Sequence, residues 1–167
     1  THINYNDVKA LKKNITADTA AFIVEPIQGE GGIYIPRESY LKEVRKMCEE
    51  KRILLIIDEI QTGCGRTGHF LASHISDINY DIVCLGKGLA GGIPVGATLV
   101  SEKIASKITR GINTSTFGGN PLACAGLLET LKLLDEKMLE HVTEMGNYFL
   151  RELKKIKFGA FASYLDS

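Results

Sequence analysis

Short apolar runs alternate with longer amphipathic stretches along this chain of 167 residues. The apolar runs at residues 20–25, 53–58, 81–87 and 97–101 have the length and composition of β-strands, and Pro26 ends the first of them. The run 53–58 shows no apolar–polar alternation, so both of its faces are apolar, as in a strand inside a parallel sheet. The runs 81–87 and 97–101 repeat this pattern. The chain is therefore predicted to contain a mostly parallel sheet.

Two longer segments have the period of an amphipathic helix. The first extends from Ser39, a plausible N-cap, to Lys51, and its apolar residues recur at helical spacing: Tyr40, Leu41, Val44, Met47 and Cys48. The second begins at Met138, and we expect it to form a helix on a face of the sheet; its apolar positions continue through Val142, Met145, Phe149 and Leu153. Strands that alternate with helices and loops indicate an α/β fold, with helices flanking the sheet.

Composition narrows the classes of partner. The chain has 44% hydrophobic residues, which is enough for one globular core, and 20 basic residues against 20 acidic ones. A net charge of zero gives no electrostatic reason to expect nucleic acid or an anionic membrane surface. No apolar run approaches the ~18 residues of a membrane span. We therefore expect a small-molecule ligand.

The cysteines, at positions 48, 64, 84 and 124, form no C-x-x-C pair, and their spacing fits no zinc site. We expect free thiols, no bound metal and a reducing, cytoplasmic compartment.

Three of the predicted strands end in polar residues: Glu25, Asp58 and Lys87. In open α/β sheets, ligands bind outside the carboxyl ends of the strands. An acid, a second acid and a lysine, each bordered by a Gly-rich turn, favour a binding site at this edge. The alternative is that strands simply end in polar residues at the surface.

The stretch from Leu54 to Gly68 fits two familiar nucleotide sites poorly. A metal-binding acid of a nucleotide hydrolase requires a G-x-x-x-x-G-K-[ST] loop, but the only Gly-Lys pair ends at Lys87 and is followed by Gly88, which has no hydroxyl. Residues 63–68 spell G-x-G-x-x-G, the spacing of a dinucleotide-binding turn. Four residues separate them from the strand, and the next residues start a helix poorly. A nicotinamide-dependent oxidoreductase remains a minor alternative.

Lys87 suggests a third kind of site. Gly86 and Gly88 border it and allow the backbone to approach a flat ligand closely. A lysine in a pocket that excludes water loses its proton more easily and becomes a nucleophile towards aldehydes. An acid on a neighbouring strand can pair with a ring nitrogen, and this combination is the protein's part in pyridoxal-phosphate chemistry. The alternative for Lys87 alone is a solvated loop lysine.

Four motifs carry a resemblance to a known family. EPIQGEGG (25–32), DEIQTGCGRTG (58–68), LGKGLAGGIPVGA (85–97) and STFGGNPLAC (115–124) resemble the class III, ornithine-type aminotransferases in order and in spacing. Within this family, the acetylornithine and ornithine aminotransferases are the most similar. The resemblance implies that residues 1–157 are the central and later part of the large, pyridoxal-phosphate-binding domain of a fold type I transferase. Residues 158–167 would be a tail of unclear origin.

The resemblance also implies roles for residues near the cofactor. Lys87 would form a Schiff base with pyridoxal 5′-phosphate, and Asp58 would pair with the pyridine nitrogen and keep it protonated. Gln61 would lie near the phenolic oxygen of the cofactor. Thr116, assisted by Ser115, would reach the phosphate of the cofactor in the other subunit, which implies a homodimer.

Glu30 is similar to the family glutamate that pairs with a substrate-binding arginine. The reaction implied is transfer of an ω-amino group from acetylornithine, ornithine or a related lysine-pathway intermediate to 2-oxoglutarate. Other class III activities, 4-aminobutyrate aminotransferase and glutamate-semialdehyde aminomutase, stay open. So does a catalytically silent fragment, because the family chain is more than twice as long.

Overall fold

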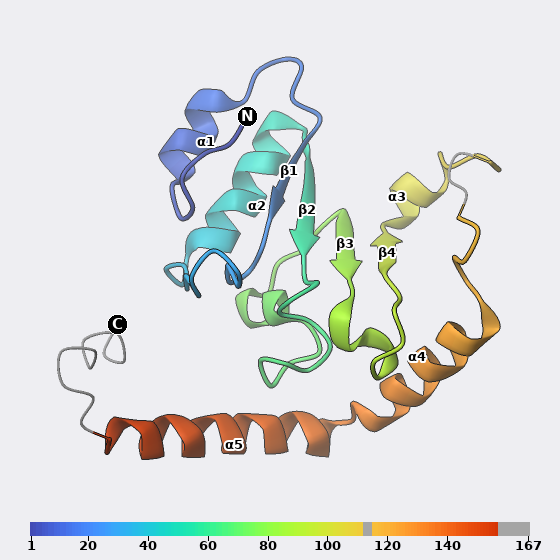
Figure 1. Ribbon diagram of the computed structural model, residues 1–167. Coiled ribbons are helices and arrows are strands. Elements are labelled where there is room, and N and C mark those ends of the chain that lie inside the picture. The colour runs from blue at the N-terminus through green and yellow to red at the C-terminus, as the bar shows by residue number, and fades with distance from the viewer. Residues whose placement is uncertain (112–114, 157–167) are drawn as a thin grey trace.

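A computed structural model describes residues 1–111 and 115–156, and its centre is a four-stranded sheet with the strand order β1-β2-β3-β4 (Figure 1). The bounds of the strands are Ala21–Val24 for β1, Leu54–Asp58 for β2, Ile82–Leu85 for β3 and Ala97–Val100 for β4. The pairs β1–β2 and β2–β3 are parallel, so the predicted mostly parallel α/β architecture is confirmed.

Strand β4 departs from the expected pattern of a strand buried inside a parallel sheet. It pairs antiparallel with β3 and is half exposed, with Thr98 and Leu99 open to solvent. The chain returns from β3 through only a short 3₁₀ turn and a loop, whereas a parallel pair requires a longer crossover. The apolar run predicted a strand here but not its direction.

The helical elements lie on one side of the sheet and beyond its ends (Figure 1). Their bounds are Val8–Asn14 for α1, Tyr40–Lys51 for α2, Ala72–Ser76 for the 3₁₀ turn η1, Lys87–Ala90 for the 3₁₀ turn η2, Glu102–Ala105 for α3, Pro121–Leu133 for α4 and Glu136–Lys154 for α5. The predicted helix 39–51 is confirmed as α2. Its start is not capped as expected, because the Ser39 hydroxyl donates to Glu43 and accepts from Arg37 and makes no hydrogen bond to the helix backbone.

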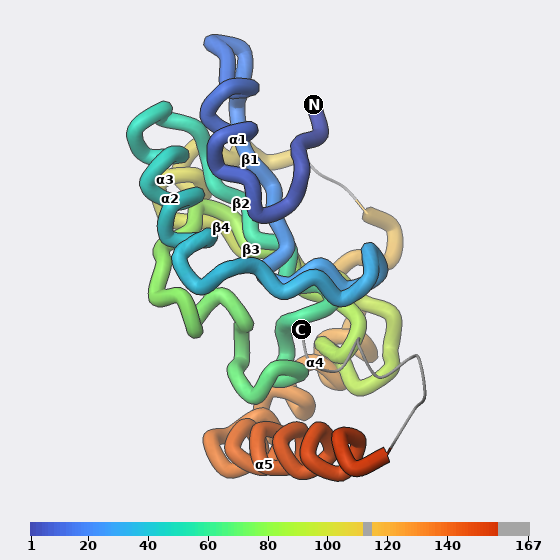
Figure 2. The backbone as a smooth tube through the Cα atoms, turned by 90° about the vertical axis from the view of Figure 1, so that its left-hand side faces the viewer, coloured from blue at the N-terminus to red at the C-terminus, as the bar shows by residue number. Residues whose placement is uncertain are grey.

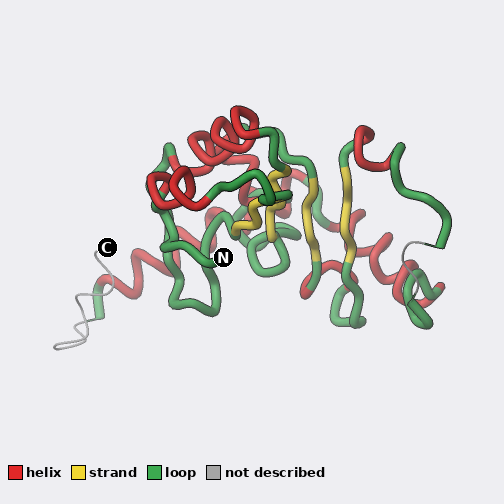
Figure 3. The backbone as a smooth tube through the Cα atoms, turned by 90° about the horizontal axis from the view of Figure 1, so that it is seen from above, coloured by secondary structure: helices red, strands yellow, loops and turns green. Residues whose placement is uncertain are grey.

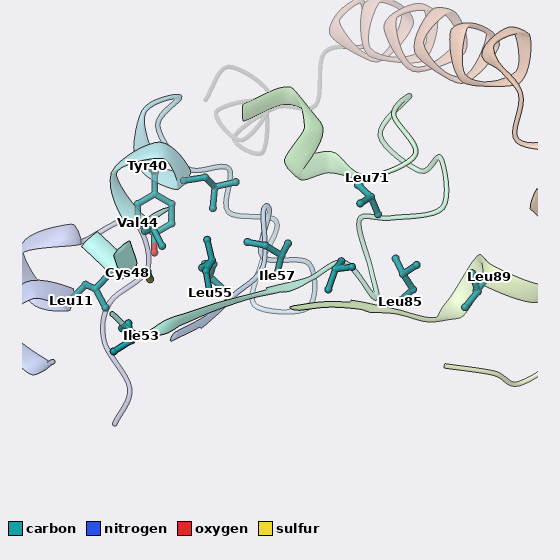
Figure 4. Close-up of a cluster of buried hydrophobic side chains, with 13 residues drawn as sticks. Leu11, Tyr40, Val44, Cys48, Ile53, Leu55, Ile57, Leu71, Leu85 and Leu89 are labelled. Carbon is teal, nitrogen blue, oxygen red and sulfur yellow. The ribbon is translucent and has the colours of Figure 1, made fainter. Parts of the chain in front are cut away.

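The hydrophobic core lies between α2 and one face of the sheet. From above, α1 and α2 lie on one side of the strands (Figure 3). Side chains of α2, including Tyr40 and Val44, pack in one cluster with Leu55, Ile57 and Leu85 of the sheet (Figure 4). On β2 the buried residues alternate with half-buried ones, so only one face of the strand is covered within the described residues.

The second predicted helix forms as α5, but it does not cover a face of the sheet. It has no buried residue, and it runs beneath the carboxyl ends of β1, β2 and β3 (Figures 1 and 2). Its contact is with the glycine turn 63–68, where a methyl group on Gly65 would lie 3.2 Å from Leu139 Cδ2, and one on Gly68 would collide with Thr143. The apolar period therefore predicted the helix correctly and its packing partner wrongly.

No helix in the described part of the chain is long and apolar enough to cross a membrane. The predicted tail, 158–167, lies outside the described residues.

Candidate active site

The carboxyl ends of β1, β2 and β3 meet at a pocket of about 180 Å³. Its lining residues come from three segments that are far apart in the sequence: Glu25, Glu30, Asp58, Ile60, Gln61 and Lys87. Parallel strands place their carboxyl ends at one edge of the sheet, so the expected meeting of Glu25, Asp58 and Lys87 is confirmed.

Lys87 does not end a buried strand, as we expected, because β3 stops at Leu85. Lys87 is the first residue of η2, and its backbone is left-handed, with φ at 48°. Its side chain is 38% exposed, so the described residues do not provide the dry pocket that the sequence suggested. The Lys87 Nζ lies 3.6 Å from Glu30 Oε1, an ion pair that is open to solvent.

Asp58 is the last residue of β2 and begins a tight turn. Its Oδ1 accepts a hydrogen bond of 3.0 Å from the backbone N–H of Ile60, which fixes the carboxylate beside the turn. Asp58 also lines a second, adjoining pocket of about 340 Å³ between β1 and the first five residues of the chain. The acid thus lies where two cavities meet.

Ile60 is a pocket residue that the sequence analysis missed. It is partly exposed and packs against the backbone of Gly86, where a methyl group would lie 3.3 Å from Ile60 Cγ2. Its apolar side chain therefore lies close to Lys87 and offers a flat ligand a hydrophobic contact. The available signal was one apolar residue between two polar pairs in the turn 58–62.

Gln61 is held by the neighbouring loop. The N–H of Gly29 donates to Glu25 Oε2 at 3.1 Å, and a methyl group on Gly29 would lie 2.7 Å from Gln61 Cγ. A backbone bridge between Gln28 and Tyr34 closes this loop into a narrow hairpin that carries Glu30 towards Lys87. The two turns interlock at the pocket.

Ser115 and Thr116 do not reach this pocket. Both are exposed, and the Ser115 hydroxyl accepts a hydrogen bond of 3.0 Å from the N–H of Gly118. Asn120 then caps α4 by accepting from the N–H of Ala123 at 2.9 Å, with Pro121 at the first helical position. Within this chain the structure places the two hydroxyls apart from Lys87.

The fold and the pocket together define a class of protein. Three groups lie together at the carboxyl edge of an α/β sheet. They are the amine of Lys87, the carboxylate of Asp58 at the end of the neighbouring parallel strand, and the apolar side chain of Ile60. These are the groups with which proteins use pyridoxal phosphate. The architecture is that of the fold type I pyridoxal-phosphate-dependent enzymes.

Comparison with known proteins specifies the family. The class-III aminotransferase family model matches residues 2–160, so the chain belongs to that family, which depends on pyridoxal phosphate. Acetylornithine aminotransferase of Methanopyrus kandleri is 49% identical over 155 residues, and ornithine aminotransferase of Oceanobacillus iheyensis is 46% identical over 158 residues. The matches cover 92% and 93% of this chain respectively.

A solved structure of the ornithine aminotransferase from Toxoplasma gondii, in which pyridoxal phosphate partly occupies the active site, superposes with a TM-score of 0.88 at 43% identity. The superposed region comprises 95% of this chain and 38% of the Toxoplasma gondii chain. The chain spans 40% of the length of each of the two relatives above.

The pocket fits one part of the cofactor. Lys87 would supply an amine for the aldehyde, Asp58 a carboxylate for a protonated ring nitrogen, and Ile60 a surface for the ring, since all three line the pocket. Among the described lining residues, Lys87 is the only cation, so the pocket provides no separate anchor for the phosphate.

Proposed function

We propose that this chain carries the reactive lysine of an aminotransferase that moves an ω-amino group from acetylornithine, ornithine or a related lysine-pathway intermediate to 2-oxoglutarate. Residues 1–157 are then the central and later part of its large domain. The observation that carries the proposal is the meeting of Lys87 and Asp58 in one pocket at the carboxyl edge of the sheet. The similarity to acetylornithine and ornithine aminotransferases supports the choice of amino donor.

Each pocket residue has a defined task in this proposal. When bound, pyridoxal phosphate supplies an electron sink for the carbon that loses its proton. Lys87 Nζ would hold the cofactor through its aldehyde and, as a free amine, would take the proton from the ω-carbon of the substrate. Asp58 would keep the ring nitrogen in its protonated form, because a nearby negative charge favours the cation. Gln61 hydrogen-bonds the phenolic oxygen.

Two further tasks involve a partner outside this pocket. Glu30 is exposed on its hairpin and pairs with a cation, at present Lys87 and in the complete site a substrate-binding arginine. The position of Ser115 and Thr116 outside the pocket supports a homodimer in which these hydroxyls hold the phosphate in the partner's site.

Glutamate formation tests the proposed reaction. The chain is incubated with pyridoxal phosphate, 2-oxoglutarate and, in turn, acetylornithine, ornithine, 4-aminobutyrate and glutamate semialdehyde. We expect glutamate from one of the first two donors with the wild-type chain and none with Lys87→Ala. Glutamate formed equally by Lys87→Ala, or formed from 4-aminobutyrate in preference to acetylornithine and ornithine, would contradict the proposal.

A further inference from the structure

Glu59 is the most deeply buried charged residue near the pocket, and the reaction proposed above gives it no task. Its side chain is fully buried, with an exposed fraction of 0%, although its neighbours Asp58 and Ile60 both line the pocket. Pairing with β3 continues one residue beyond β2, to Glu59, and successive side chains of an extended strand point to opposite sides. Glu59 therefore faces the interior, as Ile57 does, while Asp58 faces the pocket. Burial of a carboxylate is unfavourable unless hydrogen bonds satisfy it.

Three donors converge on the Glu59 carboxylate. The Thr62 hydroxyl donates to Oε2 at 2.5 Å, the N–H of Ala72 donates to Oε2 at 3.1 Å, and the N–H of Ser73 donates to Oε1 at 2.7 Å. Hydrogen bonds to an ionised acceptor are stronger than neutral ones. Two of these donors lie beyond the glycine turn 63–68, so the carboxylate joins the two ends of the segment 59–73.

The backbone of Glu59 is held as well. Its N–H donates to the carbonyl of Cys84 at 2.9 Å, which continues the pairing of β2 with β3, and its carbonyl accepts from the N–H of Gly63 at 2.8 Å. The turn 59–63 is therefore tied to the sheet by backbone and to η1 by the side chain. Asp58, Ile60 and Gln61 lie on or beside this turn.

We propose that Glu59 is a positioning residue: its buried carboxylate clamps the turn 59–63 onto Ala72 and Ser73 and so fixes Asp58, Ile60 and Gln61 opposite Lys87. This inference rests on the proposed function for the identity of the ligand, but the clamp itself is a property of the chain without ligand. Its consequence is that loss of the clamp weakens cofactor binding by misplacing the pocket groups, with Lys87 chemically intact.

The test uses Glu59→Gln and Glu59→Ala, with Thr62→Val and Thr62→Ser as a second pair that alters the clamp from the donor side. Gln keeps one acceptor oxygen but presents an amide N–H₂ to one of the two backbone N–H groups, that of Ala72 or that of Ser73, and Val removes the hydroxyl that Ser retains. Glu43→Gln is the matched control, because the Glu43 carboxylate is hydrogen-bonded too, by Arg37 and Ser39, but lies on exposed α2 surface away from the pocket.

The first measurement is hydrogen exchange of the chain without cofactor. We expect the Ala72 or the Ser73 amide to exchange faster in Glu59→Gln than in wild type, and both to exchange faster in Glu59→Ala. Both should stay unchanged in Glu43→Gln. Unchanged amide exchange rates in both Glu59 variants would overturn the clamp, independently of whether the chain binds pyridoxal phosphate.

The second measurement is the pyridoxal phosphate concentration needed for half-maximal borohydride-stable labelling of Lys87. We expect it to rise by about tenfold in Glu59→Ala and in Thr62→Val, since small misplacements of site groups weaken binding strongly. Thr62→Ser, which keeps the hydroxyl, should have the half-maximal concentration of wild type. A fall in thermal stability with unchanged half-maximal concentration would show a purely structural role and overturn the proposal. Absence of labelling in the wild-type chain would overturn the proposed function, while the exchange experiment would still decide the clamp.

Discussion

Lys87 has a left-handed backbone conformation, with φ at 48°, between Gly86 and Gly88. A side chain with a Cβ is unfavourable in this region by roughly 1–2 kcal/mol relative to right-handed conformations. Strain of this kind collects at functional sites, where the surrounding structure imposes it. The side chain of Lys87 is therefore presented to the pocket at a cost in stability.

Replacement of Lys87 separates this strain from the loss of the amine. We expect Lys87→Gly to be more stable than Lys87→Ala by about 1 kcal/mol, because glycine adopts positive φ without a Cβ penalty. Lys46, an exposed residue inside α2, is the matched control with the opposite sign: Lys46→Gly should be less stable than Lys46→Ala by about 1 kcal/mol. Urea unfolding measures both differences, and a Lys87→Gly variant no more stable than Lys87→Ala would exclude backbone strain.

At the scale of elements, the pocket is built from two turns that pack against each other, one after β1 and one after β2. The hairpin around Gly29 packs against Gln61, and Glu25 accepts the N–H of Gly29. These contacts connect the end of β1 to the end of β2. A change in one turn is thus transmitted to the residues of the other.

A methyl group at Gly29 tests this connection. Gly29→Ala places the new methyl 2.7 Å from Gln61 Cγ, so Gln61 has to rotate out of its position. At Gly31, two residues along the same hairpin, the nearest atom would lie 3.8 Å away, which is ordinary contact. We expect Gly29→Ala to weaken pyridoxal phosphate binding by about tenfold and Gly31→Ala to leave it unchanged. Equal effects of the two variants would argue against the interlocked turns.

A second connection between elements involves Asp81, which precedes β3. Its Oδ2 accepts from the N–H of Leu55 at 2.8 Å and from Arg45 Nη1 at 2.9 Å, so one carboxylate joins β2 to α2. Burial alone raises the pKa of Asp81, but the hydrogen bond from Leu55 and the pairing with Arg45 outweigh it. The pKa of Asp81 therefore lies below its ordinary value of 3.8.

A lowered folded-state pKa means that the ionised form stabilises the fold above about pH 4, and that this contribution is lost as the pH falls further. We expect Asp81→Asn to lower the free energy of unfolding by about 2 kcal/mol at pH 7, because Arg45 and the Leu55 N–H lose a charged acceptor. The difference from wild type should shrink below pH 4. Asp18→Asn, in an exposed loop, is the control. An Asp81→Asn difference that persists undiminished at pH 3 would contradict this account.

For the whole molecule, the sheet has two unlike faces. The face that carries Leu55 and Ile57 is buried under α2, whereas Ile23, paired with Ile56 on the opposite face, is 58% exposed within the described chain. All pocket residues lie at the carboxyl edge between these faces. The position of the site is therefore fixed by the parallel strands, and its chemistry by the turns that follow them.

The sequence predicted the strands, α2 and the meeting of Glu25, Asp58 and Lys87, because apolar periodicity and parallel topology determine them. It did not predict that Lys87 would begin a 3₁₀ turn, since a run of apolar residues does not show where backbone pairing stops. The packing of α5 was also missed, because an apolar helix face does not specify what covers it. Glu59 escaped attention because its role depends on Ala72 and Ser73, which only the folded chain brings close.

Covalent trapping tests the central claim, that Lys87 is the residue that binds pyridoxal phosphate opposite Asp58. The wild-type chain is incubated with pyridoxal phosphate, reduced with borohydride, digested and mapped by mass spectrometry, with Asp58→Asn treated in parallel. The account predicts a stable adduct on Lys87 that forms at lower cofactor concentration in wild type than in Asp58→Asn. Labelling that spreads over other lysines and persists at the same level in Lys87→Ala would contradict it.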